Sequence, residues 1–369
     1  MQLSFFDGNE QFKIDKPIRL IELFAGYGSQ AVALKYLGVN FKHHKISEWA
    51  VKSIQAYKDL HFGDDNTDYS QGHTVEEIRE FLYGRISFDY NTPATNERID
   101  KLKESEIRTI FNNMVATNNL GSITAIKGEE LRITDTDKYC YVLTYSFPCQ
   151  DLSSAGKGAG MGRDSGTRSG LLWQVERLLK ETPNKPNVLI MENVPEVIGT
   201  KNIKHFSQWV EFLDGLGYKS KWEVLNGKDF GIAQNRARLF MVSVLGDYYY
   251  EMPTGHKLEH RLKDFLDKSV DESYYLKDET IKQLNLHKQR HEEKGHGFGW
   301  KPTTGGAMHT QSKLKVDTDP TATLLLSHQG TKVEKFTEVA TTLMARDYKG
   351  FGNQPMNAVM EVPPHWSTK

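Results

Sequence analysis

Short apolar runs that alternate with helical patterns are the feature that most limits how this 369-residue chain can fold. Each run begins or ends at glycine, proline or asparagine, as strands do at the edges of a sheet. The runs are IRLIELF (18–24), FKHHKISEWA (41–50), YCYVLTYSF (139–147), NVLIMENV (187–194) and RLFMVSVLG (238–246). Because helical patterns separate them, the sequence predicts βαβ units and an α/β fold with a mostly parallel sheet.

An insertion and a late change of character divide the rest of the chain. Two helical patterns, HTVEEIREFLYG and ERIDKLKESEIRTIFNNMVATN, interrupt the strands, and Thr74 and Glu77 in the first match a capping box. Toward the end, apolar periodicity gives way to Gly, Thr, Lys and His. We therefore expect a first domain over residues 1–247, with a helical pair inserted at the sheet edge over about 61–120, and a smaller, loop-rich domain over residues 248–369.

Composition excludes several classes of function. No apolar run approaches the ~20 residues that span a bilayer, and the acidic start MQLSFFDGNEQF is unlike a signal peptide. Two cysteines, Cys140 and Cys149, cannot form a disulfide framework. We expect a soluble protein of the cytoplasm that binds no membrane. Its net charge of −1 means that any contact with nucleic acid needs a local basic surface.

The first candidate site is the stretch FAGYGSQA, which fits G-x-G-x-x-A between a strand and a helix. Glycines in such a turn let a ligand approach the backbone, and an acid about 20 residues further on binds a ribose. Glu48 lies at that distance, at the end of the next predicted strand. The pattern predicts a nucleotide-like cofactor, and the alternative is a tight turn that binds no ligand.

Two further strand ends carry groups suited to catalysis. Cys149 follows Pro148 directly after an apolar strand. A thiol of ordinary pKa is only a few per cent thiolate at neutral pH, so a catalytic cysteine needs a neighbouring cation or helix start. The alternative is a packed strand-end thiol.

Glu192 lies among the apolar residues Met191 and Val194 at the end of the next strand. Burial there favours the protonated form of its carboxyl group, which can then donate a proton. The alternative is a helix-capping glutamate.

Two arginines precede the last predicted strand. Arg236 and Arg238 are two positions apart, so their side chains project to the same face of a strand. Two guanidinium groups suit an anionic partner such as a phosphate or carboxylate. The alternative is a pair of solvated surface arginines.

In this order and spacing, the patterns resemble the C5-cytosine DNA methyltransferase family from about Ile18 to Leu245. ELFAGYGSQA resembles the family's S-adenosylmethionine loop, SEW its ribose acid and adenine-stacking residue, and SFPCQDLS its catalytic loop. ENV and QNRAR match its substrate-base acid and paired arginines. The resemblance implies a Rossmann-like, S-adenosylmethionine-dependent methyltransferase domain with a smaller, loop-rich target-recognition domain.

The resemblance also implies a reaction and a set of site residues. A DNA (cytosine-5-)-methyltransferase acts on a cytosine flipped out of double-stranded DNA at a specific sequence. Cys149 attacks C6, Glu192 protonates or hydrogen-bonds N3, Arg238 binds the base carbonyl and Arg236 the DNA backbone. The implied cofactor residues are Phe24, Ala25, Gly26, Gly28, Ser29, Glu48, Trp49, Ser122, Ile123 and Pro148. The implied substrate residues are Gln150, Ser153, Asn193 and Gln234, and no metal is expected.

Departures from the family pattern leave alternatives open. Ser29, Ser122 and Asp151 stand where the family commonly has glycine, an acid and proline. The late family motifs R-x-L-T-P-x-E and R-L-x-G-F are absent, and the closing Q-x-G-N-S has only a poor echo in GFGNQPMNAV. One alternative is therefore a second polypeptide that supplies these motifs. Another is a non-catalytic or split-enzyme subunit that binds DNA or a partner.

Two other enzyme classes share part of the pattern. An NAD-type dehydrogenase shares the glycine turn and its acid, but it has no use for the Cys, Glu and paired Arg set. A tRNA cytosine methyltransferase shares all four patterns, and the large C-terminal region favours DNA as the substrate. The setting that the resemblance implies is a bacterial cell or a phage-infected host, in which a cognate restriction endonuclease is a further partner.

Overall fold

The computed structural model describes residues 10–152, 160–163 and 165–261, the single residues 264, 279, 282, 286 and 293, and three two-residue strands further on. By its contacts the chain divides into two units: Met1–Glu223 with Leu239–Met252, and Val224–Arg238 with Pro253–Lys369. Ser153 and most of the region expected to form the loop-rich domain lie outside the described residues.

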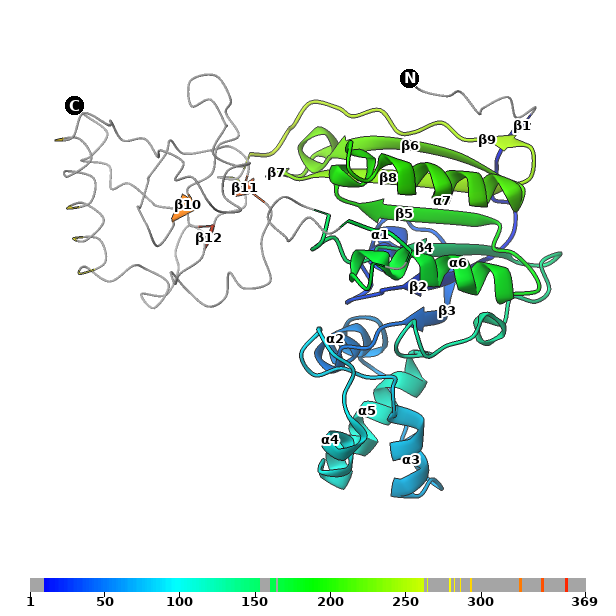
Figure 1. Cartoon of the computed structure of the whole chain (residues 1–369), viewed down its shortest axis with the longest axis vertical. Coiled ribbons are helices and arrows are strands. Elements are labelled where there is room, and N and C mark those ends of the chain that lie inside the picture. Colours follow the sequence, from blue (N-terminus) through cyan, green and yellow to red (C-terminus); the bar gives the residue numbers. More distant parts are fainter. Residues whose placement is uncertain are drawn as a thin grey trace. The chain divides into compact units, whose positions relative to one another are not determined.

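In the described part of the chain, six strands form one sheet in the order β3-β2-β4-β5-β8-β6 (Figure 1). They are β2 (Ile18–Leu23), β3 (Phe41–Ser47), β4 (Cys140–Tyr145), β5 (Val188–Asn193), β6 (Tyr218–Asn226) and β8 (Ala237–Leu245). Neighbours among the first four are parallel, and β8 is antiparallel to β5. The predicted mostly parallel sheet is confirmed. Strand β6 is not among the predicted strands, because it is an edge strand in which only Tyr218 and Ser220 are buried.

Helices cover both faces of this sheet, as Figure 1 shows. They are α1 (Ser29–Tyr36), α6 (Leu172–Glu181) and α7 (Ile203–Gly215). Side chains alternate between the two faces along each strand. In β2, Leu20 packs in one cluster with Ala31 of α1, whereas Leu23 packs in another with residues of α6 and α7. The result is a three-layer arrangement, with helices on both faces of the sheet, within the predicted α/β fold class.

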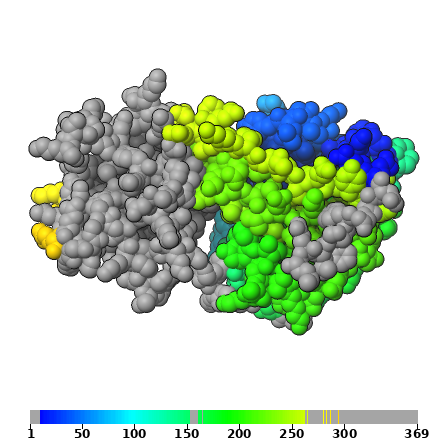
Figure 2. Space-filling model, turned by 90° about the horizontal axis from the view of Figure 1, so that it is seen from above, coloured from blue at the N-terminus to red at the C-terminus, as the bar shows by residue number. Residues whose placement is uncertain are grey.

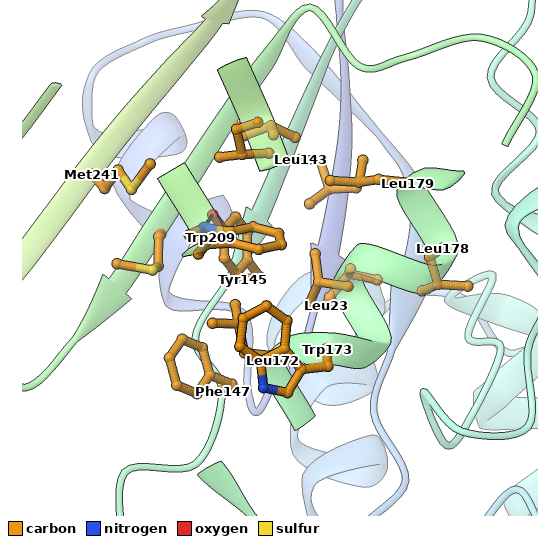
Figure 3. Packing of buried hydrophobic residues seen from close by; sticks show 14 of the residues in the cluster. Leu23, Leu143, Tyr145, Phe147, Leu172, Trp173, Leu178, Leu179, Trp209 and Met241 are labelled. Carbon is orange, nitrogen blue, oxygen red and sulfur yellow. Dashed lines mark hydrogen bonds between the residues drawn. The ribbon is translucent and has the colours of Figure 1, made fainter. Parts of the chain in front are cut away.

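The larger cluster is built around aromatic rings beneath the carboxyl end of β4 (Figure 3). Trp209 of α7 donates from Nε1 to the hydroxyl of Tyr145 at 3.0 Å, and the two rings meet edge-on with centroids 5.7 Å apart. Trp173 of α6 meets Trp209 in the same manner at 6.4 Å. Edge-to-face pairs stabilise a core beyond the apolar area that they bury. This aromatic packing stabilises the segment that leads from β4 to Cys149.

The inserted segment forms helices beside β3, at the edge of the sheet (Figure 1). They follow α2 (Val51–Phe62) and are α3 (Val75–Leu82), α4 (Asn96–Asp100) and α5 (Glu104–Ala116). The predicted capping box is confirmed: the backbone N–H of Glu77 donates to Thr74 Oγ1 at 3.2 Å, and that of Thr74 to Glu77 Oε2 at 3.0 Å. The second helical pattern breaks at residues 101–103, where Glu106 Oε2 accepts from the N–H of Lys103 and begins a new helix.

Shorter elements complete the described chain. They are β1 (Glu10–Gln11), η1 (Gly128–Leu131), η2 (Ser169–Leu171), η3 (Pro195–Ile198), η4 (Gly227–Phe230), β7 (Gln234–Asn235), β9 (Tyr248–Tyr249), β10 (Leu325–Leu326), β11 (Ala340–Thr341) and β12 (Met356–Asn357). Strand β1 pairs in parallel with β9, and Figure 2 shows the dark-blue start of the described chain beside the yellow-green segment after β8. Among helices of described residues, none is long and apolar enough to cross a membrane.

A buried carboxyl group lies at the end of β2, on the face that Leu20 shares. Glu22 is 1% exposed, and it accepts hydrogen bonds from the Tyr57 hydroxyl at 2.5 Å and from the backbone N–H of Ala31 at 3.3 Å. Burial raises the pKa of Glu22 from its ordinary 4.5 to about 7, and the two hydrogen bonds offset only part of that effect. This group therefore titrates near neutral pH in the folded protein.

We expect Glu22 to make the folded protein less stable as pH rises through this range. The unfolded chain releases this proton near pH 4.5 and the folded chain near pH 7, so between them the folded state holds more protons and higher pH favours unfolding. The free energy of unfolding therefore falls by ~3 kcal/mol between the pKa of Glu22 in the unfolded chain and its pKa in the folded chain. Urea unfolding of wild type and Glu22→Gln at pH 5 and pH 8 measures it. Equal pH dependence in both proteins would contradict the assignment.

Candidate active site

The turn between β2 and α1 has a backbone that depends on two glycines. Gly26 and Gly28 have φ values of 57° and 83°, in the left-handed region that favours glycine. A Cβ at Gly28 would lie 2.4 Å from His61 Nε2, so no larger residue fits there. A Cβ at Gly26 would meet no atom of the described chain within 4 Å. Side chains therefore pack closely against the turn at Gly28, whereas its backbone at Gly26 is open to a ligand.

Glu48 follows β3 and lies directly beside this turn. Its carboxylate is 8% exposed and accepts from the backbone N–H of Gly26 at 2.8 Å and of Ala50 at 2.7 Å. Burial raises the pKa of this carboxyl group. A carboxylate has about four lone-pair sites, so two backbone bonds leave acceptor capacity for hydroxyl groups. Trp49, the next residue, is half-buried.

Asn119 connects Glu48 to the stretch that contains Ser122 and Ile123. Its Oδ1 accepts from the N–H of Glu48 at 3.1 Å and of Gly121 at 2.9 Å, and its Nδ2 donates to the Glu48 carbonyl at 2.9 Å. Ser122 and Ile123 are both buried. Sequence reasoning did not single out Asn119. The only local signal for it in the sequence is its place two residues before a glycine, Gly121, which has a φ of 82° in the structure.

Cys149 lies in the segment that leaves β4. The preceding Phe147 is 2% exposed and anchored in the main cluster (Figure 3), and Cys149 itself is half-buried against that cluster. The Ser169 hydroxyl, at the start of η2, donates to the carbonyl of Pro148 at 2.8 Å. Cys140, the other cysteine, is enclosed within β4, where burial raises its pKa to about 11. Cys149 is thus the more accessible of the two thiols.

Glu192 is the last residue but one of β5, the parallel neighbour of β4, so its side chain lies at the same edge of the sheet as Cys149. The Ser146 hydroxyl donates to Glu192 Oε2. Asn193, 3% exposed, donates from Nδ2 to the Phe147 carbonyl at 2.9 Å. These two bonds tie the ends of both strands together. Glu192 is half-buried, whereas the apolar sequence around it predicted a more enclosed carboxyl group. Ser146 carried no signal in the sequence beyond its place at a strand end.

Asp151 fixes the chain just after Cys149. Its Oδ2 accepts from the backbone N–H of Arg168 at 2.9 Å and of Ser169 at 3.3 Å. The guanidinium of Arg168 donates to Gln150 Oε1 at 2.8 Å. A proline at this position, as is common in the family that the sequence resembles, has no carboxylate to accept these bonds. Asp151 therefore anchors the segment that contains Cys149 to the first turn before α6.

We expect Asp151→Ala to lower kcat about tenfold, because the two N–H groups lose their acceptor and Cys149 is less firmly placed. Single-turnover kinetics of the reaction that the sequence resemblance implies measure the loss. Asp89→Ala is a matched control, since Asp89 accepts from the backbone N–H of Asn91 and Thr92 in the insertion. Both variants should lose stability, and only Asp151→Ala should lose kcat. An equal kcat in the two variants would exclude this positioning role.

The paired arginines belong to the second unit. Arg236 lies between β7 and β8, and its backbone N–H donates to Asn226 Oδ1 at 3.0 Å. Arg238 lies in β8 and donates to the carbonyl of Ala237 at 2.7 Å. Both are half-buried, as is Gln234 of β7. The backbone of the arginine segment is thus held by a hydrogen bond to the end of β6.

Comparison with known proteins identifies the family. Residues 84–355 match the family described as C-5 cytosine-specific DNA methylase. The chain belongs to this family. The methylase is 37% identical over 265 residues to the orphan methyltransferase M.SssI of Spiroplasma monobiae. The alignment covers 71% of this chain and 68% of M.SssI. It is 35% identical over 269 residues to the type II methyltransferase M2.ScrFI of Lactococcus lactis subsp. cremoris, over 72% and 71% of the two chains.

Solved structures include the Dnmt2 methyltransferase of S. pombe, which aligns with 15% identity and a TM-score of 0.46 over 74% of this chain and 67% of its own. The family, the α/β fold and the enzyme class predicted from the sequence are confirmed. The methylase is a DNA cytosine-5-methyltransferase that uses S-adenosylmethionine, and DNA is its substrate.

The residues around the β2 turn fit this cofactor. The backbone at Gly26 is open to an approaching ligand, and the buried Glu48 carboxylate beside it retains acceptor capacity for ribose hydroxyls. The half-buried ring of Trp49 adds an apolar surface next to that acid.

Proposed function

We propose that this methylase transfers a methyl group to C5 of a flipped-out cytosine in a specific sequence of double-stranded DNA, through a covalent bond between Cys149 Sγ and C6. The observation that supports it best is the placement of Cys149 and Glu192 at the carboxyl ends of neighbouring parallel strands, tied by the bond from Asn193 to Phe147. When bound, S-adenosylmethionine supplies the methyl group as an electrophile.

In this mechanism the side chains act on a base that is a poor nucleophile at C5. The Cys149 thiolate adds to C6, and the displaced electron pair is accommodated as Glu192 delivers a proton to N3. C5 then has enamine character and forms the new carbon–carbon bond. Loss of the C5 proton to a base expels the thiolate, and N3 returns its proton to the Glu192 carboxylate, which restores the neutral aromatic ring and the acid. The hydroxyl of Ser146 keeps the Glu192 carboxyl group oriented.

The proposed cofactor site lies at the carboxyl ends of β2, β3 and β4 and includes the stretch at Ser122. Its residues are Phe24, Ala25, Gly26, Gly28, Ser29, Glu48, Trp49, Ser122, Ile123 and Pro148. Glu48 holds the ribose hydroxyls and Trp49 stacks on the adenine. Support comes from the open glycine turn, and from Asn119, which bonds to both Glu48 and Gly121.

The proposed substrate residues are Gln150, Ser153, Asn193, Gln234, Arg236 and Arg238. Arg238 contacts the base carbonyl and Arg236 the DNA backbone, where a guanidinium binds phosphate well. Asn193 positions the catalytic segment, since both its polar atoms bond to backbone groups. Residues 248–369 recognise the target sequence as a smaller domain.

The cellular setting is also proposed. Bacterial relatives support action on DNA in the cytoplasm of a bacterial cell or a phage-infected host. Their names support two settings: M.SssI is called an orphan methyltransferase and M2.ScrFI a type II methyltransferase. A cognate restriction endonuclease belongs to the second setting only.

Nucleoside mass spectrometry of unmethylated DNA, after incubation with the protein and S-adenosylmethionine, tests the proposal. We expect 5-methyldeoxycytidine with the wild type and none with Cys149→Ser. Product from both proteins would refute the assigned nucleophile. A wild type that binds DNA without forming product would instead favour a non-catalytic subunit, or one that needs a second polypeptide.

A further inference from the structure

Helix α1 begins directly after the cofactor turn and lacks a capping side chain of its own. Its N-cap is Gly28, which offers no side-chain acceptor, and no residue in its first turn is acidic. The first N–H groups of a helix need acceptors, and a carboxylate there is favoured by the helix dipole. Glu22 fills this role from β2, since its Oε1 accepts from the N–H of Ala31 at 3.3 Å.

Tyr57 of α2 holds Glu22 in this place. Its hydroxyl donates to Glu22 Oε2 at 2.5 Å. The same ring packs under the turn, because a Cβ on Gly28 would lie 2.6 Å from Tyr57 Cε2. One side chain thus contacts both the helix-capping acid and the backbone of the cofactor turn.

His43 of β3 orients the Tyr57 hydroxyl. Its Nδ1 lies 2.8 Å from the Tyr57 oxygen. Because the single hydroxyl proton is directed at Glu22, His43 donates and carries its proton on Nδ1. Burial, with His61 and Lys35 nearby, lowers the pKa of His43 to about 4, so the ring is neutral at pH 7. A hydrogen-bonded chain therefore runs from His43 through Tyr57 to Glu22.

His61 also packs against Tyr57. Its ring is tilted by 42° against the Tyr57 ring, with centroids 4.4 Å apart, and its Nε2 donates to the carbonyl of Tyr27 at 2.9 Å. Lys35 Nζ donates to His61 Nδ1 at 3.1 Å, which fixes the neutral form of this ring. The backbone of Tyr27 and Gly28 thus lies against the rings of Tyr57 and His61, while the Tyr27 side chain is 60% exposed.

We propose that Tyr57, oriented by His43, is a positioning residue for S-adenosylmethionine binding. It holds Glu22 against the first turn of α1 and so keeps the turn at residues 24–29 in its left-handed, ligand-ready form. The inference rests on the proposed cofactor site. When a binding-competent conformation is only partly populated, ligand affinity falls by that fraction. Losing this support therefore weakens cofactor binding and leaves the chemical step unchanged once the cofactor is bound.

Tyr57→Phe keeps the ring under Gly28 and removes only the hydroxyl. We expect calorimetric titration with S-adenosylhomocysteine to show about tenfold weaker binding. The KM for S-adenosylmethionine should rise in proportion, while kcat and the DNA Kd stay within about twofold. Tyr83→Phe is the matched control, since Tyr83 donates to Asp100 at 2.6 Å on the surface of the insertion. It should bind S-adenosylhomocysteine like the wild type.

A pair of His43 variants separates positioning from general destabilisation. His43→Asn retains a side-chain N–H close to the position of Nδ1 and should preserve affinity for S-adenosylhomocysteine. His43→Leu cannot donate and should reproduce the loss seen in Tyr57→Phe. Equal affinities for the two His43 variants would refute the role of this hydrogen bond.

Glu48→Ala, checked for folding by urea unfolding, distinguishes failure of this inference from failure of the cofactor site. If it binds S-adenosylhomocysteine as tightly as wild type, the proposed site is wrong and the inference fails with it. If Glu48→Ala loses binding while Tyr57→Phe and Tyr83→Phe bind equally, the site stands and the positioning role of Tyr57 is refuted.

Discussion

Replacing Cys149 with serine is expected to abolish methyl transfer, with a loss of about ten-thousandfold or more in rate. In the proposed mechanism the thiolate is the form that adds to C6. A serine hydroxyl is scarcely ionised at neutral pH, so the oxygen analogue is a far weaker nucleophile. Serine is close to cysteine in size, and Cys149 is only half-buried, so the fold should persist. Radiolabelled methyl transfer to DNA measures the effect.

Cys140→Ser is the matched control, because Cys140 is enclosed in β4 with a pKa raised to about 11 and stays protonated. It should retain activity and lose some stability. DNA that carries 5-fluorocytosine gives a second readout. After methylation its C5 bears fluorine and methyl and has no proton to lose, so the thiolate is not expelled. A complex stable to denaturant should form with Cys140→Ser but not with Cys149→Ser, and the reverse pattern would assign the nucleophile to Cys140.

The elements that sequence reasoning predicted are those whose signal is local. Strand β4 is a continuous apolar run because both of its faces are covered by helices, and the capping box at Thr74 lies within four residues. Strand β6 gave no such signal, because an edge strand with few buried positions reads as polar. The break between α4 and α5 depends on Glu106 capping Lys103, which competes with an otherwise helical pattern.

The candidate site likewise contains residues that the sequence predicted and residues that only the structure revealed. Reactive side chains at strand ends follow from the sequence, since the carboxyl ends of parallel strands share an edge. The residues that position these side chains do not follow from the sequence, because they are far along the chain from the residues that they contact. Asn119 is 71 residues from Glu48, and Tyr57 is 35 residues from Glu22. Asparagine and tyrosine are common, and only the register of the sheet and the packing of α2 bring these two side chains to Glu48 and Glu22.

Replacing Glu192 with glutamine should give the second-largest loss, about a thousandfold in single-turnover rate, because proton transfer by a placed acid contributes roughly 10²–10⁴-fold. Glutamine matches the acid in shape, and its carbonyl oxygen can still accept from the Ser146 hydroxyl. Its amide hydrogen-bonds N3 but transfers no proton. The tie between Asn193 and Phe147 involves neither group, so the strand ends should stay joined.

The measurement separates the chemical step from binding. At saturating S-adenosylmethionine, DNA affinity measured by fluorescence anisotropy should match wild type. Trapping on 5-fluorocytosine DNA should slow by the same factor as methylation, because in the proposed mechanism protonation at N3 accompanies attack at C6. Glu196→Gln changes an exposed glutamate of η3 and should leave both rates unchanged. If Glu192→Gln slows methylation but not trapping, Glu192 acts after adduct formation, and the acid that assists Cys149 is another group.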